Sequence, residues 1–339
     1  MRIVFTTQLP AEGFRRLETY FKHSTNGEGL VMCMIGEENW QEGEVLVSTF
    51  DYKVPRALID SMPRLQLIAN FGAGYNNIEL SACQARGIRV TNTPQPVIEP
   101  TAELAFALMI DVARRVSEFD REMRNGLEDE RMRGLEDERM RGLEGERCEP
   151  VEFGVMRHLS HSLYGKTLGI IGMGRIGQAL ARRALASGMR IIYHNRHRLS
   201  DEIEEKYHAG YVDFQTLLQD SDFVSLNLPY TPEVHHLIGQ PEFGMMKRSA
   251  YLINTARGAH VDEEALVEAL QSGIIAGAAM DVYEHEPAIS SALLHLPNVV
   301  LSPHTGTGTW EGRIAMCENV TDNILAYVQN NIQGMNIVL

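Results

Sequence analysis

A glycine-rich turn between a strand and a helix constrains the fold of this chain more than any other feature. The apolar run 168–171 precedes Gly172, Gly174 and Gly177, and a second apolar run, 190–193, follows at the distance expected in a strand–helix–strand unit. The first glycine permits a tight turn, the second lets the backbone approach a pyrophosphate, and the third allows close packing of helix on strand. We therefore predict a dinucleotide-binding turn at a helix N-terminus, with a purely structural glycine turn as the alternative.

Short apolar runs alternate with amphipathic patterns along most of the 339 residues. Strands are predicted at 2–6, 44–48, 65–70, 167–171, 190–194, 223–226, 250–254, 276–282 and 299–301. Helices are predicted at 13–21, 56–61, 101–116, 176–186, 263–272 and 310–328. This alternation is typical of α/β folds with doubly wound parallel sheets, and the length favours two domains. The last helix is expected to pack back on the first domain.

Composition and charge exclude several classes of protein. The formal net charge of −14 opposes nucleic-acid binding, and the longest apolar stretches are far shorter than a membrane span. The N-terminal residues read as a strand rather than a signal peptide, so we expect a soluble, cytoplasmic protein. The four cysteines have no paired spacing, so neither a disulfide framework nor a metal site is predicted.

An eight-residue unit repeats nearly three times between residues 123 and 147, as MRNGLEDE, RMRGLEDE and RMRGLEGE. Asp129 with Arg133, and Asp137 with Arg141, have the spacing of ion pairs along a helix. However, a period of eight drifts around a helix, and the glycine in each unit weakens helix formation. We favour a solvated, mixed-charge insert, and an arm that binds a partner is the alternative.

The end of the second strand of the glycine-turn unit bears on which dinucleotide binds. An acidic residue there would bond the ribose of NAD, but this chain has His194-Asn195-Arg196-His197-Arg198. Arg196 and Arg198 could clamp a 2′-phosphate, so we predict that NADP is preferred over NAD. The alternative is that these arginines lie on a solvated loop.

Three polar segments each follow a predicted strand: Asn254 to Gly258, Asp281 to Pro287, and Ser302 to Gly306. Ligands of open α/β sheets lie beyond the carboxyl ends of the strands, so these segments should converge near the cofactor. They would bring together an arginine, a carboxylate and a histidine.

The chain resembles the D-isomer-specific 2-hydroxyacid dehydrogenase family nearly end to end, apart from the repeat. The resemblance rests on segments 72–78, 101–105, 172–177, 228–233, 246–258, 281–287 and 302–304. It implies two Rossmann-like domains, a flavodoxin-like substrate domain at 1–103 and 305–339 and a dinucleotide-binding domain at 104–304. It also implies hinges at the helices near 101–118 and 305–328, and a homodimer formed through the dinucleotide-binding domain.

The resemblance further implies that Arg257, Glu286 and His304 are the catalytic residues. Reduction of a 2-keto acid needs a proton on the carbonyl oxygen, and an imidazolium such as that of His304 can donate one. Glu286 would orient the imidazole and favour its protonated form. Arg257 would bind the substrate carboxylate or polarise the carbonyl, and backbone N–H groups around Ala73 and Gly74 would also grip the carboxylate.

Several other positions are expected to contact the cofactor. The resemblance implies that Asp281 bonds the nicotinamide amide, with a capping role after its strand as the alternative. It also implies that Thr101 lies near the phosphates, with a helix N-cap as the alternative. The full set expected at the cofactor is Thr101, Gly172, Gly174, Arg175, Ile176, Gly177, Asn195, Arg196, Leu228, Pro229, Thr255, Ala256, Asp281 and Gly306.

Within the family, Asn195-Arg196 and the 226–233 stretch are most similar to glyoxylate/hydroxypyruvate reductases. Reduction of glyoxylate or hydroxypyruvate is therefore the favoured activity. D-lactate, 3-phosphoglycerate and branched-chain 2-hydroxy acids are alternative substrates. A dinucleotide-sensing binding protein with negligible turnover is the alternative from another functional class.

Overall fold

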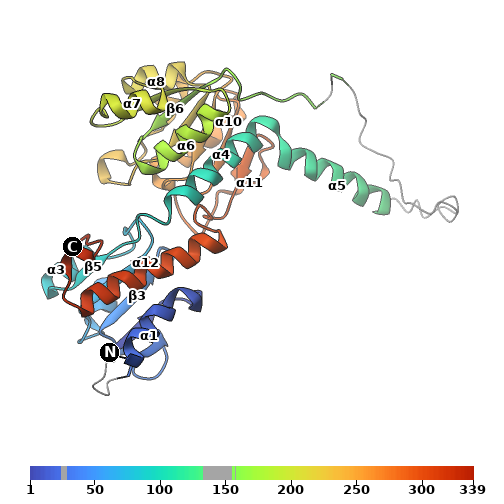
Figure 1. The fold of residues 1–339 in the computed structure, drawn as a ribbon. Coiled ribbons are helices and arrows are strands. Elements are labelled where there is room, and N and C mark those ends of the chain that lie inside the picture. Colours follow the sequence, from blue (N-terminus) through green and yellow to red (C-terminus); the bar gives the residue numbers. More distant parts are fainter. Residues whose placement is uncertain (24–28, 133–154, 157) are drawn as a thin grey trace. The chain divides into compact units, whose positions relative to one another are not determined.

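The structure is a computed structural model that describes residues 1–23, 29–132, 155–156 and 158–339. The chain divides into two compact units (Figure 1). The first unit contains Met1–Thr101 and Thr305–Leu339, and the second contains Ala102–His304. No helix in the described ranges has both the length and the apolar character needed to cross a membrane.

The first unit is built on a five-stranded parallel sheet in the order β2-β1-β3-β4-β5. The strands are β1 Arg2–Phe5, β2 Val31–Met34, β3 Val45–Thr49, β4 Leu67–Phe71 and β5 Arg89–Thr91. Every residue of β3 and β4 is buried, as expected for central strands covered on both faces. The order is that of flavodoxin-like folds, which confirms the predicted fold class.

The C-terminal helix α12, Trp310–Val328, packs against β4 and α1 of the first unit, as its apolar pattern predicts. The Thr321 hydroxyl donates a hydrogen bond of 2.9 Å to the Gly13 carbonyl. A side chain at Gly13 would lie 2.2 Å from Cys317 Cβ, so only glycine permits this close approach. The other helices of this unit are η1 Ala11–Phe14, α1 Arg15–His23, η2 Trp40–Glu42, α2 Arg56–Asp60, α3 Leu80–Arg86 and η6 Ile332–Gly334.

The second unit is built on a seven-stranded parallel sheet in the order β12-β11-β10-β9-β6-β7-β8. The strands are β6 Thr167–Ile171, β7 Arg190–His194, β8 Ala209–Tyr211, β9 Phe223–Leu226, β10 Tyr251–Asn254, β11 Gly277–Met280 and β12 Val299–Leu301. The order reverses between β6 and β9. This is the point where a Rossmann sheet binds a dinucleotide.

Helices and short turns connect these strands. They are α6 Arg175–Ala186, α7 Asp201–Tyr207, α8 Phe214–Asp220, η4 Pro232–Val234, α9 Gln240–Met245, η5 Gly258–His260, α10 Glu263–Gln271 and α11 Ser291–His295. Helices α6 and α8 both pack against β6 and β7. A buried aliphatic cluster around Leu226, Leu252 and Met280 holds the β9, β10 and β11 side of this sheet to α8, α9 and α10.

The helix predicted at 101–116 is present with shifted bounds, and a second helix follows it directly. Helix α4, Ile98–Arg114, ends where Arg115 adopts a φ of 57°, and α5, Val116–Met132, begins directly after it. The backbone of the first repeat unit is helical, with Gly126 inside α5, because one glycine costs only about 1 kcal/mol in a helix. The rest of the repeat, with Arg133 and the pair Asp137 and Arg141, lies outside the described residues, as does Cys148. The cysteines Cys33, Cys83 and Cys317 are free and buried.

Candidate active site

The three glycines of the turn between β6 and α6 have three different surroundings. Gly172 has a φ of 93°, and a Cβ there would lie 2.8 Å from the carbonyl carbon of Asn227. A Cβ on Gly177 would lie 2.6 Å from the Gly172 carbonyl oxygen. A Cβ on Gly174 would meet nothing within 4 Å. The first and third glycines are therefore required by packing, whereas the second leaves open space at the N-terminus of α6.

The N-terminus of α6 is suited to an anion. The N–H groups of a first helical turn have no intrahelical acceptor. The N-cap residue, Gly174, has no side chain that could accept from them. Arg175 and Ile176 are the first two helical residues. These N–H groups and the helix dipole favour a phosphate at this position.

Unpartnered buried oxygen atoms lie at the carboxyl ends of the neighbouring strands. Asn227 Oδ1, after β9, and Thr255 Oγ1, after β10, have no hydrogen-bond partner within the described part of the chain. Burying such atoms without a partner costs about 1–3 kcal/mol each. Together with the open space at Gly174, they fit a polar ligand such as the dinucleotide at the switch point of the sheet.

Hydrogen bonds among four side chains shape the loop after β7, and two of them, Asn195 and Arg198, are expected at the cofactor. Asn195 Oδ1 accepts a 2.7 Å hydrogen bond from the N–H of Met173, so this side chain holds the glycine turn. Arg198 pairs with Glu204 at 2.7 Å and 2.8 Å. Tyr193, at the core of the unit, donates to the same carboxylate at 2.6 Å. These bonds hold the pKa of Glu204 near 2, with the Arg198 contact as the largest cause.

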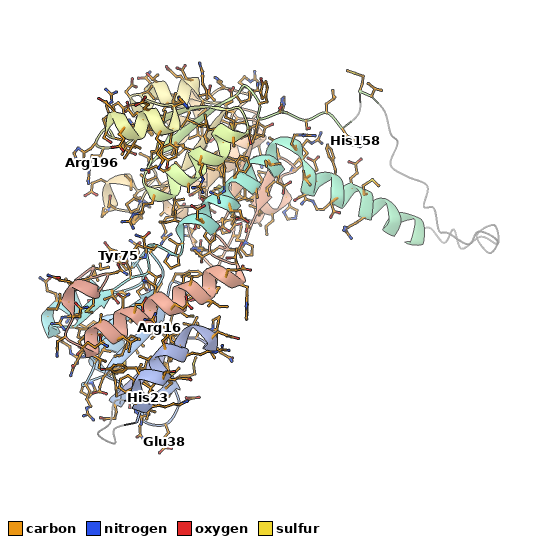
Figure 2. All side chains as sticks on the ribbon, in the orientation of Figure 1. Arg16, His23, Glu38, Tyr75, His158 and Arg196 are labelled. Atoms are coloured by element: carbon orange, nitrogen blue, oxygen red, sulfur yellow. The ribbon has the colours of Figure 1, made fainter. Side chains whose placement is uncertain are left out.

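Arg196 lies between these anchored residues and is exposed at the surface of the second unit (Figure 2). Its positive charge is a minor cause of the lowered pKa of Glu233, after the hydrogen bonds that this carboxylate accepts. Of the two arginines expected at a 2′-phosphate, Arg198 is committed to Glu204, whereas Arg196 has an exposed guanidinium.

The turn after β10 presents Arg257. Asn254 shapes it by accepting from the Ala256 N–H at 3.0 Å and donating to the Arg257 carbonyl at 2.9 Å. Arg257 donates to the Ala256 carbonyl at 2.6 Å, and burial lowers the pKa of its guanidinium while the charge of Glu286 opposes that effect. An arginine held in a poorly solvated position attracts an anion more strongly than one in water.

His260 is buried beside this turn with no exposed surface. Burial lowers its pKa to about 4, and the positive charge of Arg257 acts in the same direction. His260 is therefore neutral at pH 7 and adds no second positive charge next to Arg257.

Glu286 and His304 form a hydrogen-bonded pair at the ends of β11 and β12. His304 Nδ1 lies 2.8 Å from Glu286 Oε2, and the two side chains are 23% and 32% exposed. Burial would raise the pKa of Glu286, but the hydrogen bond and charge of His304, the N–H of Tyr283 and the charge of Arg257 together lower it. Glu286 is thus an ionised partner for the imidazole of His304.

The backbone around this pair is fixed by the strand ends. Asp281 is 1% exposed, its N–H donates to the Asn254 carbonyl at 2.9 Å, and its carbonyl accepts from the His304 N–H at 2.8 Å. Tyr283 donates its hydroxyl proton to the Ser302 carbonyl at 2.8 Å. His304 itself adopts a φ of 53°, which is uncommon outside glycine and is found most often at functional sites.

The loop after β4 in the first unit contains Ala73 and Gly74. Asn92 donates to the Ala73 carbonyl and Asn70 donates to the Gly74 carbonyl, each at 2.8 Å. In a trans peptide the N–H points opposite to the carbonyl of the preceding residue. The N–H groups of Gly74 and Tyr75 therefore point away from the side-chain amides that bind the Ala73 and Gly74 carbonyls. Neither N–H has an acceptor among the residues that the structure describes. Tyr75 is 37% exposed and is labelled in Figure 2.

The remaining predicted positions fall into both units. Leu228 and Pro229 follow β9, and Leu228 packs where a Cβ on Gly172 would intrude. Gly306 is buried in the first unit. The prediction that Thr101 is an N-cap is wrong, because α4 begins at Ile98 and places Thr101 inside its first turn. Pro100 allows this earlier start, since N–H groups in the first turn need no intrahelical acceptor.

Several residues that support the candidate site are not predicted from the sequence. Asn70 and Asn92 orient the loop at Ala73, and Arg313 on α12 lies with its guanidinium 5.6 Å from the Phe71 ring centre. Glu204 holds the loop after β7. Their signal in the sequence is a polar residue at a strand end or on a helix, which is too common to single them out.

Substituting alanine at two of the glycines should separate folding from cofactor binding. Gly174→Ala should fold as the wild type does, because its Cβ enters open space, but should weaken NADPH binding tenfold or more, by about 1.4 kcal/mol. Gly177→Ala should lower the melting temperature, because its Cβ meets the Gly172 carbonyl. Thermal unfolding and NADPH fluorescence titration measure the two effects. Equal NADPH affinity for Gly174→Ala and wild type would contradict the prediction that the dinucleotide occupies the open space at Gly174.

His260 should make stability depend on pH. Its pKa of about 4 in the folded chain lies below the value of about 6.5 in an unfolded chain, so the unfolded state binds the additional proton between these values. The free energy of unfolding should therefore fall as the pH drops from about 6.5 to about 4, by up to about 3 kcal/mol. Urea unfolding at several pH values should show a shallower fall for His260→Gln. Parallel curves for the two proteins would rule out this contribution.

Comparison with known proteins places the chain in a family. Residues 106–306 match the model for the NAD-binding domain of D-isomer-specific 2-hydroxyacid dehydrogenases. The chain is 42% identical to the glyoxylate reductase of Thermococcus litoralis, over 98% of this chain and 95% of that protein. It is similar in structure to a glyoxylate reductase from Paecilomyes thermophila, with a TM-score of 0.78, 31% identity and coverage of 100% and 98%. An NADPH-dependent glyoxylate/hydroxypyruvate reductase from Sinorhizobium meliloti, solved with NADP and malonate, gives a TM-score of 0.74 at 29% identity, covering 96% and 93%. The chain belongs to the D-isomer-specific 2-hydroxyacid dehydrogenase family.

Proposed function

We propose that this enzyme reduces glyoxylate or hydroxypyruvate to the corresponding 2-hydroxy acid, with NADPH as the preferred reductant. The observation that carries this proposal is the 2.8 Å contact between His304 Nδ1 and Glu286 Oε2. It lies in the same unit as the dinucleotide-binding turn, at the carboxyl ends of adjacent parallel strands. Relatives named glyoxylate reductase and hydroxypyruvate reductase support the choice of substrate.

The dinucleotide would be held by the glycine turn at Gly172 to Gly177, the N-terminus of α6, and the polar atoms of Asn227 and Thr255. When bound, the reduced nicotinamide supplies a hydride for the carbonyl carbon of the substrate. Arg257 binds the substrate carboxylate or polarises its carbonyl. In the first unit, the loop with Ala73 and Gly74 is expected to bind substrate through its backbone N–H groups.

His304 donates the proton that the carbonyl oxygen needs as it becomes a hydroxyl. Glu286 bonds Nδ1 and so fixes the orientation of the imidazole. In this account the first unit binds substrate, the second binds the dinucleotide and supplies the proton, and the hydrogen-bonded pair lies wholly in the second unit.

The preference for NADPH rests on the residues after β7. No carboxylate lies at the end of that strand, and Asn195 is bonded to the glycine turn. Arg196 is the exposed cation next to it and can bind a 2′-phosphate with its planar guanidinium.

We also propose that the protein is a homodimer formed through the second unit. Large apolar side chains are exposed on α5 and on the segment before β6. Val116 is 55% exposed, Leu159 59% and Tyr164 79%. Exposed apolar side chains gathered on neighbouring segments are typical of protein–protein interfaces.

Replacing His304 by alanine should remove the proton donor and lower kcat for keto-acid reduction by about 10²–10⁴-fold. Binding of NADPH should change little, because His304 is not among the groups that hold the dinucleotide. Steady-state oxidation of NADPH with glyoxylate, hydroxypyruvate, pyruvate and phenylpyruvate measures the activity, and fluorescence titration measures the binding. A wild-type protein that binds NADPH but reduces no member of this panel would favour a dinucleotide-sensing role instead.

Replacing Arg196 by glutamine should lower kcat/KM for NADPH about tenfold or more, as expected for loss of a charge-assisted contact, with little change for NADH. Arg198→Gln is the matched variant, and its main effect should be lower thermal stability, because Arg198 is bonded to Glu204. A wild-type enzyme that prefers NADH, or an Arg196→Gln variant that loses both cofactors equally, would contradict the proposed preference.

A further inference from the structure

The segment that carries Glu286 is anchored through a residue that lies outside the expected catalytic set. Glu284, two residues before Glu286, is bonded through both its carboxylate and its backbone N–H. We propose that His236, through its bond to Glu284, is a positioning residue that holds Glu286 against His304. This inference deepens the proposed function, on which it rests.

The first anchor is the bond between two side chains. His236 Nε2 lies 2.6 Å from Glu284 Oε1, and the Glu284 side chain is only 14% exposed. His236 is itself fixed, since its N–H donates to the Ala259 carbonyl at 2.9 Å and its φ is 50°. Two residues later, Ile238 forms a parallel bridge with Val261. The imidazole is therefore presented to Glu284 from a backbone that is held against the Arg257 turn.

The second anchor acts on the backbone of the same residue. The N–H of Glu284 donates at 2.6 Å to Glu263 Oε1, and Glu263 is a buried residue at the start of α10. Gly258, next to Arg257, lies against the Tyr283–Glu284 peptide. A Cβ there would be 1.9 Å from the carbonyl carbon of Tyr283 and 2.4 Å from the Glu284 nitrogen. The peptide is thus in contact with the arginine turn and bonded to α10.

The position of this peptide determines where the Glu286 carboxylate lies. Glu286 Oε1 accepts a 2.9 Å bond from the Tyr283 N–H, and Oε2 meets His304. Tyr283 also bonds the Ser302 carbonyl, two residues before His304, and burial raises the pKa of its hydroxyl to about 12, so that it keeps the proton it donates. If the bonds of Glu284 were lost, the segments that carry Glu286 and His304 would both shift. The contact between the carboxylate and the imidazole would then be misaligned.

A metal site is the competing explanation for this cluster. Ligand atoms of His235, His236 and Glu284 lie within 4.8 Å of one another. The two imidazole rings, however, are stacked at 4.0 Å with an interplanar angle of 19°. The lone pairs of a ring nitrogen lie in the ring plane, so nearly parallel rings do not direct them at one ion. His236 Nε2 also already contacts Glu284, which favours the positioning role.

The test compares His236→Ala, which removes the contact, with His236→Gln, whose amide can donate from a position similar to Nε2. His236→Ala should lower kcat about tenfold, because a displaced carboxylate no longer orients the imidazole for proton transfer. The affinity for NADPH should stay within about twofold. His236→Gln should recover most of the loss in kcat. His235→Ala is the matched control and should behave as wild type, whereas a metal site would make it as impaired as His236→Ala.

Amide hydrogen exchange of the segment 280–288 provides a readout that does not depend on activity. His236→Ala should increase exchange there, and Glu284→Gln, which keeps the shape of the side chain, should increase it less. Unchanged exchange together with a wild-type kcat in His236→Ala would overturn the proposal, even if thermal stability falls. If the wild type does not reduce keto acids, the proposed function is contradicted. The exchange measurement would still decide whether His236 anchors the segment.

Discussion

The parallel pairing of β10, β11 and β12 is the constraint on which the candidate active site depends. Because the three strands run in the same direction, their carboxyl ends meet at one edge of the sheet, where Arg257, Glu286 and His304 follow them. Backbone hydrogen bonds continue this pairing beyond the last strand residues. The Asp281 N–H donates to the Asn254 carbonyl, and the His304 N–H donates to the Asp281 carbonyl. The 2.8 Å contact of Glu286 with His304 depends on this strand register, which brings the two loops together.

The charged groups at this edge of the sheet are buried to different extents, and this determines which of them dominates. Arg257 is the most desolvated charge, and Glu286 supplies an opposing one. Glu286 stays ionised in spite of its own burial because His304, the Tyr283 N–H and Arg257 all stabilise the carboxylate. His260, the further titratable group next to the arginine, is neutral. An anion at this edge is therefore attracted by Arg257, next to a carboxylate–imidazole pair whose carboxylate remains charged.

Much of this organisation could be predicted from the sequence, because it depends on features that repeat along the chain. The apolar runs place β6, β7 and α12 within a residue of their observed bounds. The polar segments after the strands, together with the family resemblance, indicated Arg257, Glu286 and His304. The glycine turn was also predictable, since each glycine meets a distinct backbone requirement that the spacing reveals.

The direction in which individual side chains point could not be predicted. Asn195 occupies the position expected of a ribose ligand, but its amide oxygen bonds Met173, and Arg198 turns toward Glu204 six residues later. The start of α4 at Ile98 was missed because Pro100 is normally a stop signal, although it is tolerated in a first turn. The anchoring of Glu284 by His236 joins segments 48 residues apart, which only the folded chain brings together.

The central claim is that this chain transfers hydride from a nicotinamide dinucleotide to the carbonyl carbon of a small 2-keto acid. The most direct measurement uses NADPH deuterated at nicotinamide C4, in separate preparations for each face of the ring, with glyoxylate or hydroxypyruvate as substrate. Mass spectrometry of the product should show one deuterium on C2 from one of the two preparations and none from the other. Product formed without deuterium from either preparation, or no product at all, would contradict the account.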